Sequence, residues 1–279
     1  MFTKSYAKIN LSLFVNKKLS NGFHDIETIF CQIDLFDKIS IKKIKNKSSD
    51  KIYITGPYSK NVNPSNNSIL KTLNILRKYN LISNFYSVKI YKKIPVFSGL
   101  GGGTSNAASI IKFLVKKKIK TEIFNKIVQN IGSDLRLFFH KQGFLKNLKT
   151  VVGFKKKYKL FFLLIKPNFF CSTKEIYSKV KNNSKKNKFS NNFFYSKSEF
   201  INQIINLNND LQSIVENKYP IIKKLISETD NLRGCYFSRM SGSGSVCYGL
   251  FINEESSKAA LKNLRKKYPK FSFSIAKTI

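Results

Sequence analysis

The chain opens with apolar and polar residues in strict alternation. In "YAKINLSLFV" one side of the segment holds Ala7, Ile9, Leu11, Leu13 and Val15, and the other holds Lys8, Asn10 and Ser12. A period of two residues is typical of a β-strand with one buried face. The alternation therefore predicts that Lys8 and Asn10 point to the same side of this strand.

The rest of the first half predicts a mixture of strands and helices. We expect a turn at 20–25, strand over 26–44 with a loop at 34–37, a capped helix over 68–79 and a strand over 86–96. Apolar residues then recur at helical spacing from about Thr104 or Ser105, and again over 121–132, where Gly132 ends the pattern. The order around the glycines at 99–103 is thus strand, loop, helix.

The second half predicts a separate layer of mixed structure. A strand begins near 160, helices are expected near 199–207 and 219–229, and a glycine-punctuated strand covers 235–252. The polar stretch 180–192 predicts a loop. We place a domain boundary near residue 155, which divides the chain into residues 1–155 and 156–279 and assigns it to the α+β class.

Composition indicates a globular protein. The chain has 279 residues, 42% of them hydrophobic, with 25 Phe and 13 Tyr. Its longest apolar run, 160–165, is far shorter than the roughly 20 residues that span a bilayer, so we expect a cytosolic protein that does not bind membranes. The four Cys and two His are widely spaced, which indicates neither a zinc site nor a disulfide framework.

The formal net charge of +36 raises the possibility of a polyanionic partner such as RNA. Only five of the 51 basic residues are Arg, the residue type favoured for specific nucleic-acid contacts, and the lysines are spread along the whole chain. Biased composition explains this charge better than a specific nucleic-acid site. A basic RNA-binding protein without enzymatic activity stays as an alternative.

Residues 95–109, "PVFSGLGGGTSNAAS", hold the densest glycine cluster in the chain. Glycines allow main-chain N–H groups to approach a ligand closely, and the positive end of the following helix favours anions, so a phosphate is the expected guest. The Walker A motif requires Lys after its last Gly, whereas Thr104 follows Gly103 here. The dinucleotide-binding fingerprint also fits poorly, and a glycine-rich turn without a ligand stays open.

Three segments together resemble the GHMP kinases, the family of galactokinase, homoserine kinase and mevalonate kinase. They are "AKINLSL" at 7–13, "PVFSGLGGGTSNAA" at 95–108 and "RMSGSGSVCYGLF" at 239–251, in the family's order. The resemblance implies a two-domain α+β GHMP kinase fold. Its N-terminal layer would resemble domain 2 of ribosomal protein S5, and its C-terminal domain would be a ferredoxin-like α/β sandwich.

One branch of the family is the most similar, because "NGFHDIETIF" at 21–30 and "IGSDLRLFF" at 131–139 resemble its motifs. That branch transfers the γ-phosphoryl group of ATP, with Mg²⁺, to the 2-hydroxyl of a cytidyl-linked methylerythritol in non-mevalonate isoprenoid synthesis. A GHMP kinase for homoserine or a mevalonate phosphate is the alternative within the family. No Mg²⁺ ligand is identified, although Thr104 or Ser105 could contribute a hydroxyl, and we expect a monomer or weak homodimer.

The resemblance also implies roles for individual residues. Asp134 would be the catalytic base and Lys8 the catalytic lysine. The ATP-binding positions would be Asn67, Lys92, Pro95, Gly99, Leu100, Gly101, Gly102, Gly103, Thr104 and Ser105. The acceptor-binding positions would be Asn10, Phe23, His24, Thr173, Tyr177, Gly242, Ser243 and Gly244, with Phe23 and Tyr177 stacking on the cytosine and His24 bonding to it.

The sequence departs from the branch at three places. Phe97 and Ser98 stand where smaller residues are usual, so we expect a repacked entrance to the glycine loop. Leu135 and Arg136 replace Val-Pro after Asp134, which predicts a looser segment there. Residues 143–151 lack the usual glycine-rich turn with its glutamate. These departures predict reduced activity with unchanged chemistry.

Overall fold

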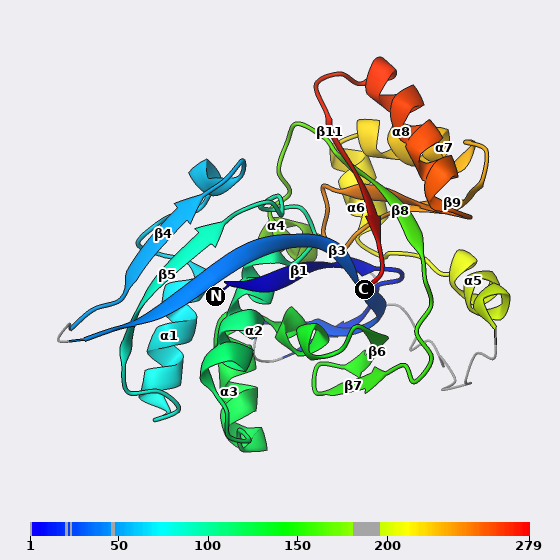
Figure 1. Cartoon of the computed structure of the whole chain (residues 1–279). Helices are drawn as coiled ribbons and strands as arrows, with labels where there is room; N and C mark the ends of the chain where they lie inside the picture. Colours follow the sequence, from blue (N-terminus) through cyan, green and yellow to red (C-terminus); the bar gives the residue numbers. More distant parts are fainter. Residues whose placement is uncertain (1, 20–21, 23, 46–47, 181–195) are drawn as a thin grey trace. The chain divides into compact units, whose positions relative to one another are not determined.

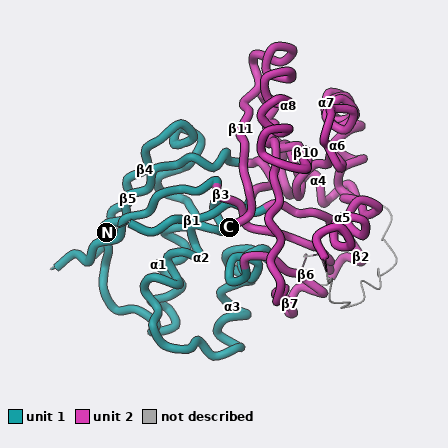
Figure 2. Tube along the Cα trace, turned by 45° about the vertical axis from the view of Figure 1, so that its right-hand side comes forward, with its two compact units in different colours: residues 1–8, 35–96, 101–140 teal, residues 9–34, 97–100, 141–279 magenta. Residues whose placement is uncertain are grey.

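The structure is a computed structural model that describes residues 2–19, 22, 24–45, 48–180 and 196–279. It contains two compact units, coloured separately in Figure 2. Unit 1 comprises residues 1–8, 35–96 and 101–140, and unit 2 comprises residues 9–34, 97–100 and 141–279. The chain therefore passes between the units several times. The expected boundary near residue 155 divides the chain into two continuous domains, and it stays a prediction.

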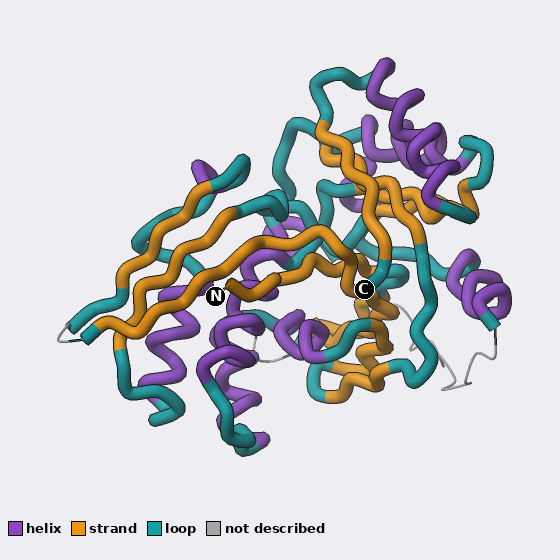
Figure 3. Tube along the Cα trace, in the orientation of Figure 1, coloured by secondary structure: helices purple, strands orange, loops and turns teal. Residues whose placement is uncertain are grey.

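Unit 1 is a sheet with helices packed on one face (Figures 1 and 3). The second half of β3 (His24–Ile44) pairs antiparallel with β5 (Phe85–Tyr91), which pairs parallel with β4 (Lys51–Thr55). β1 (Phe2–Asn10) also pairs with β3. The inward residues of these strands alternate with outward ones, and Val88 and Ile90 are buried.

Three amphipathic helices cover the inward face of this sheet. They are α1 (Ser68–Lys78), α2 (Gly102–Leu114) and α3 (Thr121–Ile131). Their apolar residues, with those of β3 and β5, form one buried cluster that includes Leu73, Ile111 and Val128. Two 3₁₀ helices, η1 (Ser59–Asn61) and η2 (Ser133–Phe139), complete the unit. The core thus holds the start of α2 and η2 against the same sheet.

Unit 2 contains a hairpin layer and a four-stranded antiparallel sheet. In the first, the N-terminal half of β3 pairs with β2 (Phe14–Lys18) and β6 (Gln142–Asn147), and β6 pairs with β7 (Thr150–Gly153). The second has the order β11-β8-β10-β9. Its strands are β8 (Phe161–Lys166), β9 (Cys235–Met240), β10 (Cys247–Phe251) and β11 (Ser272–Lys277).

Helices α7 (Ile221–Asp230) and α8 (Glu254–Lys267) contact this four-stranded sheet. Leu225 and Leu264 from these helices share a buried cluster with Leu163 and Phe251 of the strands. The shorter helices of the unit are α4 (Thr173–Ser178), α5 (Lys197–Ile205) and α6 (Gln212–Lys218). The expected loop at 180–192 lies, apart from residue 180, outside the described residues.

The two-domain α+β prediction is confirmed, but several elements differ from expectation. The loop expected at 34–37 is wrong, because β3 continues through it and both acidic residues accept main-chain N–H groups: Asp34 from Lys277 and Asp37 from Ile94. α2 begins at Gly102, before the expected Thr104. Sequence analysis also missed β4, β6, β7, α4, α6, α8 and β11.

Two further features concern the apolar character of the helices and the state of the cysteines. Among the described residues, no helix has both the length and the apolar character needed to cross a membrane. The four cysteines are free thiols, and Cys31, Cys171 and Cys247 are buried. Burial raises the pKa of the Cys171 thiol to about 11, so this group is protonated at neutral pH.

Candidate active site

The glycine loop ends where α2 begins, and side chains are excluded there by close contacts. Gly101, in the left-handed region with a φ of 68°, is the N-cap of α2. A Cβ on Gly102 would lie 2.8 Å from Ile94 Cγ2 and 2.9 Å from Lys92 Nζ. A Cβ on Gly101 would lie 2.8 Å from Phe138 Cζ. This close packing requires glycine at both positions. The first N–H groups of a helix lack partners within the helix, and they favour an anion.

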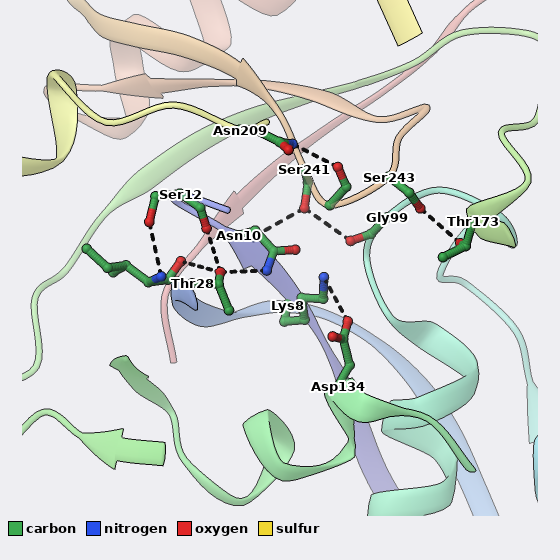
Figure 4. Close-up of polar contacts among 12 residues, drawn as sticks. Lys8, Asn10, Ser12, Thr28, Gly99, Asp134, Thr173, Asn209, Ser241 and Ser243 are labelled. Atoms are coloured by element: carbon green, nitrogen blue, oxygen red, sulfur yellow. Dashed lines mark hydrogen bonds and ion pairs between the residues drawn. The ribbon is translucent and has the colours of Figure 1, made fainter. Parts of the chain in front are cut away.

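Lys8 and Asp134 form an ion pair in unit 1, with 3.2 Å between Nζ and Oδ2 (Figure 4). The Lys8 side chain is only 3% exposed, whereas the Asp134 side chain is 31% exposed. The lysine reaches its partner from β1, and Lys8 Cε lies 3.2 Å from the position of a Cβ on Gly101. The pair thus places a buried cation and a solvent-accessible carboxylate next to the start of α2.

The segment after Asp134 is anchored, in contrast to the looseness expected from the missing proline. Leu135 is fully buried in the unit 1 core. The Arg136 guanidinium donates to Asn125 Oδ1 and lies 5.0 Å from the centre of the Phe124 ring. Lys112 Nζ also donates to the Phe138 carbonyl, at 2.5 Å. Packing and hydrogen bonds therefore hold η2 where a proline would have restricted φ.

The other residues of unit 1 that were predicted to bind ATP differ in their burial and in their hydrogen bonds. Asn67 is the N-cap of α1, where its side-chain oxygen accepts from the N–H groups of Ile69 and Leu70. Its amide nitrogen donates to the carbonyls of Asn63 and Pro64, so a ligand would have to replace one of these bonds. Both donors and both acceptor positions of this side chain are used.

Lys92 and Ser105 are also committed to protein partners. Lys92 is 3% exposed and pairs with the fully buried Asp37. The Ser105 hydroxyl donates to the Tyr6 carbonyl at 2.6 Å and lies 2.7 Å from the Ser5 hydroxyl. Of the two hydroxyls considered as Mg²⁺ ligands, the one on Ser105 is therefore buried and occupied.

In unit 2, Asn10 is held from both its backbone and its side chain. Its Nδ2 donates to Thr28 Oγ1 at 2.8 Å, and Thr28 donates to the Ser12 carbonyl at 2.5 Å (Figure 4). The Asn10 main-chain N–H donates to Ser241 Oγ, which in turn donates to the Gly99 carbonyl at 3.1 Å. Asn10 and Ser12 are both buried, although the alternating pattern predicted only one buried face.

A tight turn over residues 241–246 joins β9 to β10. Asn209 Nδ2 donates to the carbonyls of Met240 and Gly242, both at 2.8 Å. The hydroxyls of Ser243 and Thr173 are 2.9 Å apart, so two predicted acceptor-binding residues lie together. A Cβ on Gly242 would lie 3.1 Å from Asn10 Oδ1. These contacts bring the turn, Asn10 and Thr173 into one polar cluster within unit 2.

The expected aromatic pair for a cytosine is only partly described. The rings of His24 and Tyr177 lie side by side, with centroids 5.2 Å apart and planes inclined by 40°. Phe23 lies outside the described residues. Partial burial, and then the charge of Lys18, lower the pKa of His24, so its imidazole is neutral at pH 7. A neutral imidazole can both donate and accept a hydrogen bond.

The entrance to the glycine loop carries an exposed aromatic side chain. Phe97 is 57% exposed and adopts a φ of 52°. Its ring meets that of Phe170 edge to face at 5.9 Å. Bulky residues rarely adopt the left-handed region, so a locally strained backbone accompanies the repacked entrance expected here.

Among the described residues, no group of three or more His, Cys, Asp or Glu side chains could hold a metal ion. Mg²⁺ is commonly bound by one or two carboxylates together with substrate phosphates and waters. Asp134 is the accessible carboxylate beside the glycine loop. The described residues therefore fit a Mg²⁺ ion that is bound mainly through substrate phosphates. They fit a metal ion bound only by protein side chains less well.

Sequence reasoning missed the buried polar residues whose hydrogen bonds hold the predicted site residues in place. Asp37, Thr28, Asn209 and Ser241 each bond to a predicted site residue or to the glycine turns, and Asn106 bonds to Asp37. Asp37 had one available signal, since it is an acidic residue within an apolar strand pattern. The others are ordinary polar residues whose partners lie far along the chain.

Comparisons with known proteins show the family of the chain. Residues 67–137 match the GHMP kinases N terminal domain, and residues 198–270 match the GHMP kinases C terminal domain. The chain therefore belongs to the GHMP kinase family, and it is an ATP-dependent small-molecule kinase.

Full-length relatives share one name within that family. A Pelagibacter ubique protein named 4-diphosphocytidyl-2-C-methyl-D-erythritol kinase is 40% identical over 272 residues, covering 95% of this chain and 94% of its own. A relative with the same name from a Wolbachia of Drosophila simulans is 33% identical, covering 96% and 95%.

Solved structures show the same fold. A crystal structure of 4-(cytidine 5'-diphospho)-2C-methyl-D-erythritol kinase aligns with a TM-score of 0.71 at 20% identity, covering 99% of each chain. Homoserine kinase from Cytophaga hutchinsonii aligns with a TM-score of 0.63 at 14% identity, covering 98% of this chain and 94% of its own.

Proposed function

We propose that this chain transfers the γ-phosphoryl group of ATP to the 2-hydroxyl of 4-diphosphocytidyl-2-C-methyl-D-erythritol, a step in isoprenoid precursor synthesis. The observation that carries the proposal is the 40% identity to a kinase of this name over 95% of the chain. The buried Lys8 beside the accessible Asp134 supports it, because phosphoryl transfer needs an oriented hydroxyl, a base and charge neutralisation.

In the proposed reaction the oxygen of the acceptor's 2-hydroxyl bonds to the γ-phosphorus, and the Asp134 carboxylate accepts the proton of that hydroxyl. The bond from the γ-phosphorus to the bridging oxygen breaks, and ADP leaves. The Lys8 ammonium, 3.2 Å from Asp134, offsets the negative charge that gathers on the alcohol and phosphoryl oxygens. Its burial strengthens this effect, because a charge acts more strongly away from water.

The glycine loop and α2 would bind the phosphates of ATP. The N-terminal N–H groups of α2 are aimed along the helix axis, and close contacts at Gly101 and Gly102 keep side chains away from them. Mg²⁺, bound mainly through the ATP phosphates, would neutralise part of their charge, and Asp134 is the residue that could contact it.

Several further residues are proposed to bind the acceptor. His24 and Tyr177 are proposed to contact the cytosine, the imidazole by hydrogen bonds and the phenol ring by stacking. Thr173, Ser243 and Asn10 offer hydroxyl and amide groups to the polar remainder of the acceptor. Each of these side chains already has a fixed protein partner, so little ordering remains to be done on binding.

A coupled assay that follows ADP release tests the proposal. The purified chain is given ATP and Mg²⁺ with the cytidyl acceptor, with homoserine, with phosphomevalonate or without acceptor. We expect the cytidyl acceptor to give the highest kcat/KM. Faster turnover of homoserine or phosphomevalonate would assign the chain to another branch, and binding of RNA without any ADP release would refute the kinase proposal.

The proposal also covers the location of the protein, its oligomeric state and its partners. A soluble acceptor and ATP are the only partners the reaction needs, so we propose a cytoplasmic monomer or weak homodimer without a specific nucleic-acid partner. The net charge of +36 would then act only through weak, salt-sensitive adhesion to polyanions.

A further inference from the structure

Two buried lysines flank the glycines at the start of α2. Both lysine side chains are almost completely buried. Each ammonium is paired with an aspartate, but the two partners differ: Asp134 is 31% exposed, whereas the Asp37 side chain is fully buried. The accessible pair suits chemistry on a substrate. The internal pair requires a different explanation.

Asp37 accepts four hydrogen bonds, which use the full capacity of its carboxylate. Its Oδ1 accepts the main-chain N–H groups of Lys93 and Ile94, at 2.7 and 2.8 Å. Its Oδ2 accepts Lys92 Nζ and Asn106 Nδ2, the latter at 2.9 Å. One carboxylate on β3 therefore joins the segment that leads into the glycine loop to the first turns of α2.

The network continues from α2 to the strand that carries Lys8. Asn106 Nδ2 also donates to Ser5 Oγ at 2.9 Å. Ser5 Oγ in turn lies 2.7 Å from Ser105 Oγ, and the latter donates to the Tyr6 carbonyl at 2.6 Å. Asp37 is thus the fixed end of a buried chain of polar groups that ties α2 to β1.

The Lys92 ammonium lies directly behind the loop. A Cβ on Gly102 would lie 2.9 Å from Lys92 Nζ, so only glycine allows the ammonium this position. Burial lowers the pKa of Lys92, and the Asp37 carboxylate opposes that shift. A cation at this place adds to the positive end of the helix dipole, where an anion is expected.

We propose that Asp37 is a positioning residue for triphosphate binding: it holds the Lys92 ammonium behind Gly102 and, through Asn106, fixes the first turns of α2. This inference rests on the proposed binding of ATP by the glycine loop. It does not depend on which acceptor the kinase uses.

The variant Asp37→Asn tests the proposal with little change in volume. Its side-chain oxygen can still accept both main-chain N–H groups, but its NH₂ group faces two donors, Lys92 Nζ and Asn106 Nδ2. We expect binding of ATP and of inorganic triphosphate, measured by calorimetry well below the melting temperature, to weaken about 10-fold or more. Adenosine, which lacks phosphates, should bind within about 2-fold of its affinity for the wild type.

Asp50 provides a matched control in the same unit. Its side chain is 2% exposed, pairs with Arg77 and accepts the Tyr86 main-chain N–H at 2.7 Å, so its setting resembles that of Asp37. Asp50→Asn should lower the melting temperature as Asp37→Asn does, yet leave triphosphate affinity within about 2-fold of wild type. An equal loss of triphosphate affinity in both variants would show a general structural effect and overturn the proposal.

A second variant covers the case in which Asp37→Asn does not fold. Asn106→Ala removes the link to α2 and leaves the Asp37–Lys92 pair intact, and it should weaken triphosphate binding about 3-fold or more. Unchanged triphosphate affinity in a folded Asp37→Asn or Asn106→Ala protein would refute the positioning role. Because these measurements use no acceptor, they remain decisive even if the cytidyl compound is not the substrate.

Discussion

Replacement of Gly99 by alanine should destabilise the protein strongly, because the structure leaves no room for a methyl group. A Cβ on Gly99 would lie 1.9 Å from the Ser241 carbonyl oxygen and 3.2 Å from the Gly244 main-chain nitrogen. Gly99 also has a φ of 75°, in the region that disfavours side chains. The Ser241 carbonyl cannot retreat freely, since it accepts the Gly244 N–H at 3.0 Å within a turn held by Asn209.

The expected magnitude follows from two contributions. Adopting the left-handed region costs a residue with a side chain about 1–2 kcal/mol. Relieving an overlap in a packed site costs about 1–3 kcal/mol. The Gly99→Ala variant should therefore lose about 2–5 kcal/mol of unfolding free energy, a large part of the stability of an ordinary domain.

Urea titration followed by circular dichroism measures this loss, with Gly103→Ala as the matched control. A Cβ on Gly103 would have 3.4 Å to its nearest neighbour, Ser68 Oγ, and the residue lies within α2. Alanine there should be neutral or stabilise by up to about 1 kcal/mol. If Gly99→Ala unfolded at the same urea concentration as wild type, or if the Gly103 variant were the weaker protein, the steric reasoning would be wrong.

Four further predictions concern the proposed catalysis, acceptor binding, the pH dependence of stability and the α1 cap. Asp134→Asn should reduce kcat by about 10²–10⁴-fold, because the base is lost. Calorimetry should find the ATP affinity of this variant within about 3-fold of wild type. Near-normal turnover would exclude Asp134 as the base. The pKa of His24 is lowered, so the KM for the acceptor should be constant from pH 8 to about 6.5 and rise only below that pH. Lys18→Gln removes a charge that lowers this pKa, so it should move the midpoint of the rise in KM to higher pH. A rise in KM above pH 7 in the wild type would contradict the neutral imidazole. The same protonation should remove stability as the pH falls from about 6.5 through the lowered pKa, and a pH series of melting temperatures checks this sign. Asn67→Ala should lower the stability of the protein by about 1 kcal/mol or more, because it removes the α1 cap and the two bonds to the Asn63 and Pro64 carbonyls. Thermal melting with Asn67→Ser, which still caps, is the comparison, and equal losses in both variants would argue against the cap.

The sequence alone predicted the features whose cause is local. The glycine loop before a helix, the N-cap at Asn67 and the end of α3 at Gly132 all follow from backbone preferences within a few residues, and each is present. The α+β class followed from periodicity, and the GHMP kinase fold followed from the resemblance of three segments to that family. Proposed roles such as those of Lys8 and Asp134 stay predictions, although the two side chains do meet.

Only the tertiary structure decided which polar groups are buried together. Asp37 and Lys92 are 55 residues apart, and Asn10 and Ser241 are 231 apart, yet each pair is joined by a hydrogen bond. The local pattern offers one signal, the acidic Asp37 within an apolar strand, but it does not identify the partner. A lysine in a strand is interpreted as a surface residue until its neighbours are known. Burial makes an unpaired charge costly, so the fold must bring the opposite charge to it, and that requirement acts across the chain.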